Sequence, residues 1–225
     1  MPRKFLAIEP HSDDIAFGMG GTIAKKISEG WVGYCLLMSS SSVQFEHTQE
    51  AITRQVRIEE HVQACEFLKI HSFNPVFEPF DADTKLDTIG QKSLINYIQR
   101  AIDLIAPEVL FVAGPSFHQD HRAVWEATMT AVRPTRKNSP DKIFTYELPT
   151  YFWNPRQYDF QPQMFEDISD FMETKISAAR CHDTQIRQED NELSLEKIKE
   201  WAKVRGFMAH CNYAEAFEIV RYIRR

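Results

Sequence analysis

Short apolar runs alternate with amphipathic stretches over the first two thirds of the chain, and this alternation narrows the possible folds more than any other feature. The runs with the length of buried strands are residues 4–8, 31–38, 108–113 and 143–147. The stretches with apolar residues at helical spacing are residues 48–68, 93–105 and 121–132. A glycine-rich turn at residues 18–21 is expected to open a further helix that ends near Gly30. Because strands separated by helices form parallel sheets, we expect an α/β fold with a mostly parallel sheet flanked by helices.

The part of the chain after Leu148 has a different composition. Aromatic residues and prolines come first, a charged helical stretch follows from Ile168 to Arg205, and a last helix is expected from Ala214. No repeat, low-complexity tract or linker separates this part from the rest of the sequence. We therefore expect residues 1–225 to form a single domain whose C-terminal part, residues 149–225, is mostly helical.

Charge and composition argue against several classes of partner. The net charge of -6 provides no basic surface for nucleic acid, and no stretch approaches the ~20 apolar residues that insert into a membrane. The N-terminus lacks the features of a signal peptide, so we expect a cytoplasmic protein. The four cysteines include no C-x-x-C pair, which argues against a cysteine zinc site and favours buried thiols.

Two polar clusters each follow a predicted buried strand. The first is His11-Ser-Asp-Asp14, and the second is His118-Gln-Asp-His121. In open parallel sheets the carboxyl ends of the strands line the ligand crevice, so these two distant clusters are expected to meet at one site.

A catalytic zinc ion needs three nitrogen or oxygen ligands and one open position for water. His11 and Asp14 provide an imidazole and a carboxylate from the first cluster, and His121 provides a second imidazole. This combination predicts a metal site. It also suits other divalent ions such as ferrous iron, so zinc is the favoured ion and not the only candidate.

The other polar residues of the two clusters have predicted roles beside the metal. Asp13 is a candidate general base, because a carboxylate suffices to deprotonate a water acidified by a metal. His118 is a candidate for stabilising an oxyanion or protonating a leaving amine. Asp120 is a candidate to hold an imidazole in one tautomer from outside the ligand set. Helix caps and surface turns explain each cluster alone, but two such clusters at strand ends favour a site.

These motifs resemble those of the PIG-L/LmbE-like de-N-acetylase family. The resemblance is carried by the Pro10–Asp14 segment, the Gly18-Met-Gly-Gly-Thr turn and the 118–121 cluster. Arg57-Ile-Glu-Glu with Ala64 is similar to a helical motif of the family, and residues 213–217 are similar to a common family ending. The resemblance implies a Rossmann-like fold and zinc-dependent deacetylation of N-acetyl sugars.

The resemblance also implies roles for individual residues. His11, Asp14 and His121 would be the metal ligands, and Asp13 the base. His118 would be the electrophilic or acid partner, and Arg57 would hold substrate hydroxyls or a phosphate. The family implies a variable, substrate-shaping segment at residues 149–225. The chain departs from the family pattern at Ser12, Ile15 and Lys69, none of which is an inferred ligand.

Other residues support weaker interpretations. The glycines at 18, 20 and 21 do not form a full G-x-G-x-x-G fingerprint, so a dinucleotide site is disfavoured. The aromatic run at residues 151–153 fits a sugar-binding face or the core equally well. His182 and His210 are more simply structural, and the histidines at 47, 61 and 71 are expected to be solvated because they lie on or near a charged helix.

The sequence thus predicts a metal-dependent hydrolase that removes an N-acetyl group from a small molecule containing an amino sugar. One alternative is a tailoring amidase that acts on a non-sugar N-acyl natural product. An alternative of another class is a non-catalytic Rossmann-like protein that binds a nucleotide. A homo-oligomer is compatible with the sequence.

Overall fold

The computed structural model describes residues 2–44, 51–73, 76–187, 191 and 193–224, and these residues build a seven-stranded sheet. In their order across the sheet, the strands are β3 (His71–Ser72), β2 (Val32–Leu37), β1 (Lys4–Glu9), β4 (Val109–Ala113), β5 (Lys142–Tyr146), β7 (Ala214–Tyr222) and β6 (Met164–Asp167). Strands β1 to β5 pair in parallel, whereas β7 is antiparallel to both of its neighbours. The predicted mostly parallel α/β sheet is confirmed.

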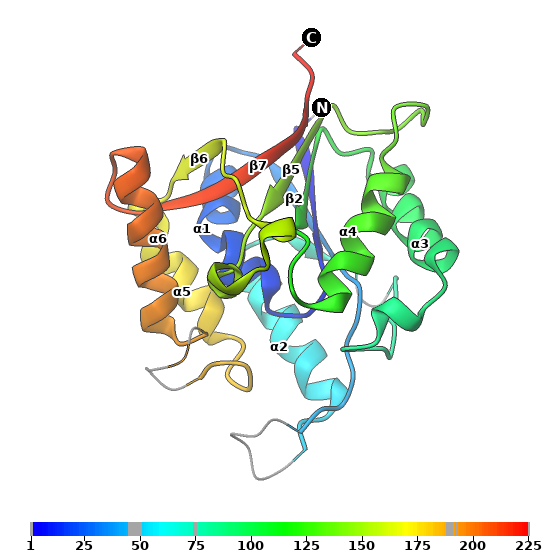
Figure 1. Ribbon diagram of the computed structural model, residues 1–225, viewed down its shortest axis with the longest axis horizontal. Coiled ribbons are helices and arrows are strands. Elements are labelled where there is room, and N and C mark those ends of the chain that lie inside the picture. The colour runs from blue at the N-terminus through cyan, green and yellow to red at the C-terminus, as the bar shows by residue number, and fades with distance from the viewer. Residues whose placement is uncertain (1, 45–50, 74–75, 188–190, 192, 225) are drawn as a thin grey trace.

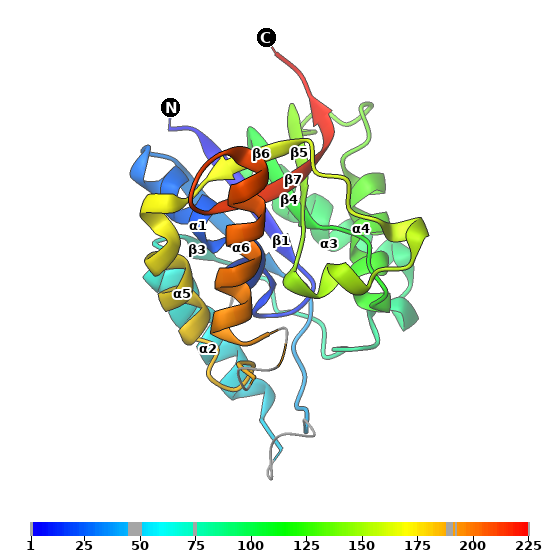
Figure 2. The ribbon, with the colours of Figure 1, turned by 60° about the vertical axis from the view of Figure 1, so that its left-hand side comes forward.

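Helices cover both faces of the sheet (Figures 1 and 2). Those on one face are α1 (Asp14–Ser28), α2 (Arg54–Phe67), α5 (Met172–Arg180) and α6 (Leu195–Ala209). Those on the other are α3 (Gln91–Ile105) and α4 (Gln119–Ala131). The short 3-10 helices are η1 (Leu86–Thr88), η2 (Pro149–Trp153), η3 (Arg156–Tyr158) and η4 (Ser169–Phe171). None of the described helices is both long and apolar enough to cross a bilayer.

The central strands are buried on both faces, which explains their continuous apolar sequences. In β1, Phe5 and Ala7 belong to the core cluster under α1, while Leu6 and Ile8 belong to the cluster under α3 and α4. Strand β4 is buried along its whole length. The two central strands therefore hold rigidly the loops that leave their carboxyl ends.

The order of the strands places a crevice between β1 and β4. These strands pair directly, with Ile8 opposite Val112. The chain leaves β1 into α1 on one face and leaves β4 into α4 on the other face. Because the two connections diverge, a crevice opens outside the carboxyl ends of the strands, as in other doubly wound sheets.

The prediction of a last helix from Ala214 is wrong, because residues 214–222 form strand β7. This segment is rich in residues that favour strands, such as Ile219, Val220 and Tyr222, and it pairs with β5 and β6. Its buried Glu215 also accepts hydrogen bonds from the backbone N–H groups of Gly21 and Thr22 in α1. Sheet pairing and this anchor outweigh the local helical pattern.

The predicted glycine turn does not precede the helix, because residues 18–21 lie inside α1, which begins at Asp14 and has a kink at Met19 (φ -141°, ψ 21°). The glycines permit close packing instead. A Cβ atom on Gly18 would lie 2.6 Å from the Tyr146 ring, and one on Gly21 would lie 2.7 Å from the Ile168 side chain. The G-x-G-x-x-G fingerprint of a dinucleotide site is absent from these positions, which disfavours the nucleotide-binding alternative.

Replacement of Gly21 by Ala is expected to lower the free energy of unfolding by about 1–3 kcal/mol, because the added methyl group overpacks the contact with Ile168. Chemical denaturation measures this change. Gly90→Ala is the matched control, since a Cβ at Gly90 meets no atom within 4 Å. Equal stability of the two variants would contradict the packing role of Gly21.

The histidines that were expected to be solvated differ from one another. His71 is exposed as expected, and His47 lies outside the described residues. His61 is buried, with 1% of its surface exposed, so the expectation is wrong for this residue. It lies on the side of α2 that faces the sheet, where its Nδ1 is 2.7 Å from Glu9 Oε1.

Candidate active site

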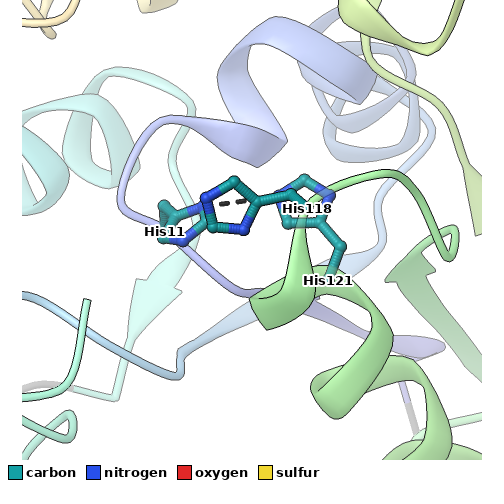
Figure 3. Close-up of side chains that lie close together, drawn as sticks. All are labelled: His11, His118 and His121. Atoms are coloured by element: carbon teal, nitrogen blue, oxygen red, sulfur yellow. Dashed lines mark hydrogen bonds between the residues drawn. The ribbon is translucent and has the colours of Figure 1, made fainter. Parts of the chain in front are cut away.

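The loops after β1 and β4 line a cavity of about 260 Å³ at the crevice. Its volume is near the lower end of the ~300–1,000 Å³ that is usual for small-molecule sites. The predicted residues that line it are His11, Asp13, Asp14, Arg57, His118 and His121. The structure therefore brings together the two clusters, which lie more than a hundred residues apart in sequence (Figure 3).

The three predicted ligands present their donor atoms to one point. His11 Nδ1 and His121 Nε2 are 3.3 Å apart, and each lies 3.5 Å from Asp14 Oδ2. In a tetrahedral site with bonds of about 2.0–2.1 Å, adjacent ligand atoms are ~3.3–3.4 Å apart. The spacing of these three atoms fits a zinc-sized divalent ion without rearrangement.

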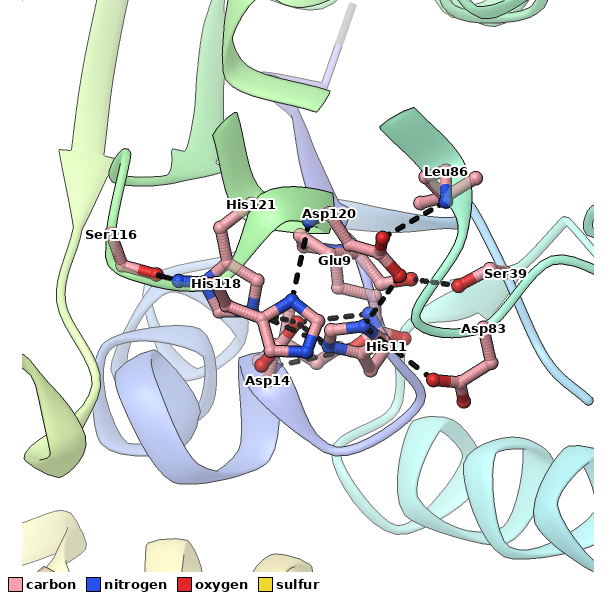
Figure 4. Close-up of polar contacts among 12 residues, drawn as sticks. Glu9, His11, Asp14, Ser39, Asp83, Leu86, Ser116, His118, Asp120 and His121 are labelled. Carbon is pink, nitrogen blue, oxygen red and sulfur yellow. Dashed lines mark hydrogen bonds and ion pairs between the residues drawn. The ribbon is translucent and has the colours of Figure 1, made fainter. Parts of the chain in front are cut away.

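Asp120 fixes the orientation of the His11 ring (Figure 4). Its Oδ2 lies 3.1 Å from His11 Nε2, and its Oδ1 accepts a hydrogen bond from the Leu86 backbone N–H. A proton held on Nε2 leaves the Nδ1 lone pair directed at Asp14 and His121. Asp120 thus occupies the position that was predicted for an imidazole-orienting carboxylate.

Tyr151 fixes the orientation of the His121 ring, as Asp120 does for His11. The sequence analysis did not assign this role to Tyr151. The Tyr151 hydroxyl donates to the Gly114 carbonyl at 2.5 Å and lies 3.0 Å from His121 Nδ1. Since its proton is directed at Gly114, the hydroxyl accepts from Nδ1–H, which leaves Nε2 of His121 as a free donor atom. The next aromatic residues, Phe152 and Trp153, are 63% and 74% exposed.

Replacement of Tyr151 by Phe is expected to weaken metal affinity about 10–100-fold, because the His121 ring loses the contact that sets its tautomer. Competition with a metal-sensitive dye measures this affinity. Tyr158→Phe is a suitable control, since Tyr158 is not among the residues that line the cavity. Unchanged affinity in Tyr151→Phe would show that Tyr151 does not orient the ring.

Charges at the site suit metal binding. Burial lowers the pKa of His121 to about 3, so this imidazole is neutral near pH 7. Burial opposes charge on Asp14, but His121 and His11 outweigh it and lower the pKa of Asp14 to about 2. For His11, Asp120 and Asp14 outweigh the opposing effect of burial and raise the pKa, so a cation that binds Nδ1 would displace a proton.

Asp13 lines the cavity beside Asp14 but makes no cap for α1. It occupies the N-cap position, yet its side chain accepts no capping hydrogen bond. The helix-cap interpretation of this carboxylate therefore fails. Burial, together with the neighbouring charge of Asp14, raises the pKa of Asp13 to about 6, a value suited to proton transfer near neutral pH.

His118 combines a cap with a place in the cavity. Its Nδ1 accepts from the Asp120 backbone N–H at 3.2 Å, which caps α4 and leaves the proton of the neutral ring on Nε2. Burial and His11 lower the pKa of His118. The centroid of its ring lies 4.8 Å from the centroid of the His11 ring and 5.4 Å from that of the His121 ring. His118 is therefore also close enough to these two residues to bind the same metal ion.

Arg57 lines the cavity and already has an acidic partner. It is 3% exposed, forms an ion pair with Asp83, and donates to the Ser41 carbonyl at 3.2 Å. Asp83 Oδ1 also lies 3.7 Å from His11 Nε2. Sequence reasoning missed Asp83, because it follows no predicted strand and belongs to no motif.

The C-terminal part of the chain completes the cavity wall. Thr150, Gln185, Arg187 and Leu193 line it together with residues of the loops after β1 and β4. His182 is fully buried beside Phe17, and among the described residues its ring nitrogens have no hydrogen-bond partner. His182 is not among the residues that line the cavity.

Comparison with known proteins identifies the family. The family described as GlcNAc-PI de-N-acetylase matches residues 6–132. Diacetylchitobiose deacetylase of Thermococcus kodakarensis is 30% identical, over 97% of this chain and 83% of its own length.

Solved structures share the fold. N,N'-diacetylchitobiose deacetylase from Pyrococcus horikoshii, 23% identical, has a TM-score of 0.70 over 97% of this chain and 84% of its own. The 4-carboxy-2-hydroxymuconate hydratase GalB from Pseudomonas putida KT2440 is 20% identical. Its TM-score is 0.74, over 99% of this chain and 98% of its own. One fold thus accommodates different reactions, and the family assignment rests on the sequence matches. The chain belongs to the GlcNAc-PI de-N-acetylase family.

Proposed function

We propose that this protein is a zinc-dependent N-deacetylase that hydrolyses the acetamide of an amino sugar or of a small conjugate that contains one. The convergence of His11 Nδ1, Asp14 Oδ2 and His121 Nε2 at 3.3–3.5 Å is the observation that carries this proposal. Family membership and the identity with diacetylchitobiose deacetylase support the substrate class.

His11, Asp14 and His121 would hold the metal, which would supply a Lewis-acid charge to polarise an amide carbonyl and acidify water. Asp13 lies on the wall of the cavity with a pKa of about 6 and accepts the proton of the attacking water. His118 directs its remaining N–H group at the same space, where it stabilises the oxyanion by hydrogen bonding, and the leaving amine takes the proton that Asp13 accepted from the water. Acetate and a free amine are the products.

We also propose that residues 149–225 belong to the same domain and shape the substrate side of the site. Thr150, Gln185, Arg187 and Leu193 come from this part and line the cavity. The hydrogen bonds from the Gly21 and Thr22 backbone N–H groups to Glu215, and the ion pair between Arg205 and Glu147, join it to the rest of the chain. The loops after β1 and β4 would thus supply the catalytic groups, and residues 149–225 would determine which substrate fits.

The proposed function is tested by measuring acetate release from diacetylchitobiose, from N-acetylglucosamine and from acylated amines without a sugar. We expect preference for the sugars, loss of activity after chelation and recovery with zinc. Preference for the amines without a sugar would support the tailoring-amidase alternative. Absence of hydrolysis with all of them, in a protein that binds metal, would contradict deacetylation of these substrates.

Replacement of Arg187 by Ala is expected to raise KM about 10-fold with a smaller change in kcat, because Arg187 lines the cavity but is not one of the predicted metal ligands. Steady-state kinetics on two sugar substrates measures both constants. Arg156→Ala is the matched control, since Arg156 is exposed and is not among the lining residues. A fall in kcat with unchanged KM would assign Arg187 to the chemical step instead.

A further inference from the structure

A second group of metal-ligating side chains lies in the core under α2. It consists of Glu9, Cys35, His61 and Cys65, which we call the Cys–His cluster. One ligand atom from each of Cys35, His61 and Cys65 lies within 4.8 Å of the others. All four side chains are at most 1% exposed. None of them lines the active-site cavity.

Three elements bring the cluster together. His61 and Cys65 are one turn apart in α2, so both lie on one side of the helix. Cys35 in β2 pairs with Ala7 in β1, and alternation along β1 places Glu9 on the same face as Ala7. The search for C-x-x-C pairs in the sequence did not reveal this group, because its two cysteines come from separate elements, β2 and α2.

The separations in the cluster are close to those of a tetrahedral site. Glu9 Oε1 is 3.3 Å from Cys35 Sγ and 2.7 Å from His61 Nδ1, while His61 Nδ1 is 4.0 Å from Cys65 Sγ. Zinc bonds of about 2.3 Å to sulfur and about 2.0–2.1 Å to nitrogen or oxygen place adjacent ligands ~3.3–3.8 Å apart. For these three pairs, changes of roughly half an ångström in separation would reach the tetrahedral values.

His61 and Glu9 each have a second polar atom in the side chain, and that atom already has a partner outside the cluster. His61 Nε2 lies 2.9 Å from Ser72 Oγ, and Glu9 Oε2 accepts from the Ile15 backbone N–H at 3.1 Å. These contacts leave Glu9 Oε1 facing Cys35 Sγ and His61 Nδ1, whereas Cys65 Sγ lies beside the His61 ring, 3.6 Å from Nε2 and 4.0 Å from Nδ1. Support of this kind from outside the ligand set is the usual arrangement for histidine and carboxylate ligands.

We propose that Glu9, Cys35, His61 and Cys65 form a second, structural metal site for zinc or another thiophilic divalent ion. Two thiolates with one imidazole and one carboxylate fill a tetrahedral shell and leave no open position, which distinguishes a structural site from a catalytic one. Binding releases the two thiol protons and the proton that lies between His61 Nδ1 and Glu9 Oε1. Through Glu9 and Ile15 the ion would fix the start of α1, next to Asp13 and Asp14.

Cobalt substitution separates the two sites, because thiolate ligands give Co²⁺ a charge-transfer band in the near ultraviolet that nitrogen and oxygen ligands do not give. We expect metal-depleted protein to bind two equivalents of Co²⁺, one of which produces the band. His121→Ala should keep the band and lose the other equivalent. Cys65→Ala should lose the band and keep the catalytic equivalent, with Cys181→Ala as the matched control.

The proposal is judged on the wild-type protein even if Cys65→Ala does not fold. A single equivalent of Co²⁺ without the band, together with no rise in Tm when zinc is added to His121→Ala, would overturn it. The cluster would then be a hydrogen-bonded group of free thiols around the pair formed by His61 and Glu9. Failure of the deacetylase proposal has a different signature, which is absence of hydrolysis with the thiolate band intact.

Discussion

Replacement of Asp13 by Asn is expected to lower kcat about 10²–10⁴-fold, the usual contribution of a general base. The amide has nearly the shape of the carboxylate but cannot take a proton from water near neutral pH. Asp13 makes no capping hydrogen bond in α1, so the substitution should leave the helix intact. Acetate release under saturating substrate measures the effect.

The metal content of Asp13→Asn should remain that of the wild type, because Asp13 is not among the three converging donors. Asp87→Asn is the matched control, since Asp87 is exposed and is not among the residues that line the cavity. Full activity in Asp13→Asn would exclude Asp13 as the base. Loss of metal with loss of activity would move Asp13 into the ligand set.

Replacement of His121 by Ala is expected to remove the catalytic metal and to lower kcat/KM at least about 10³-fold, since the metal supplies several kcal/mol of transition-state stabilisation. His121 Nε2 lies 3.3 Å from His11 Nδ1 and 3.5 Å from Asp14 Oδ2, so its loss opens one side of the site. Elemental analysis after dialysis, combined with kinetics, measures both effects.

His210→Asn is a matched control for this variant, because His210 is exposed and its left-handed backbone conformation is one that Asn tolerates. His118→Ala tests the neighbouring histidine. It should keep the metal and lose rate if His118 acts on the oxyanion or the amine. Metal loss in His118→Ala, with metal retained in His121→Ala, would replace the proposed ligand set by one that contains His118.

Much of the fold could be predicted because local patterns and long-range packing agree in its first 150 residues. Strand β4 illustrates this agreement, since an apolar run of the right length became a strand buried on both faces. Strand β7 illustrates the opposite case. Its segment carries an ambiguous local pattern, and pairing with β5 and β6 decided its conformation.

In the candidate site, too, some residues could be predicted from local sequence and others could not. Motif spacing indicated the residues of the two loops, because the carboxyl ends of adjacent parallel strands meet. Tyr151 and Asp83 could not be found from the sequence, since a tyrosine in an aromatic run and an aspartate in a loop have no local signature. Each acquires its place only through contact with a histidine from another element.

The sequence by itself determined the alternation of strands and helices and the two clusters of imidazoles and carboxylates, because both are encoded within short stretches of chain. Only the tertiary structure decided which of these groups share a site, which tautomers their neighbours hold, and that Cys35, His61 and Cys65 are buried together. The physical reason is that tautomers, pKa values and ligand distances depend on partners distant in sequence, which packing alone brings within a few ångströms.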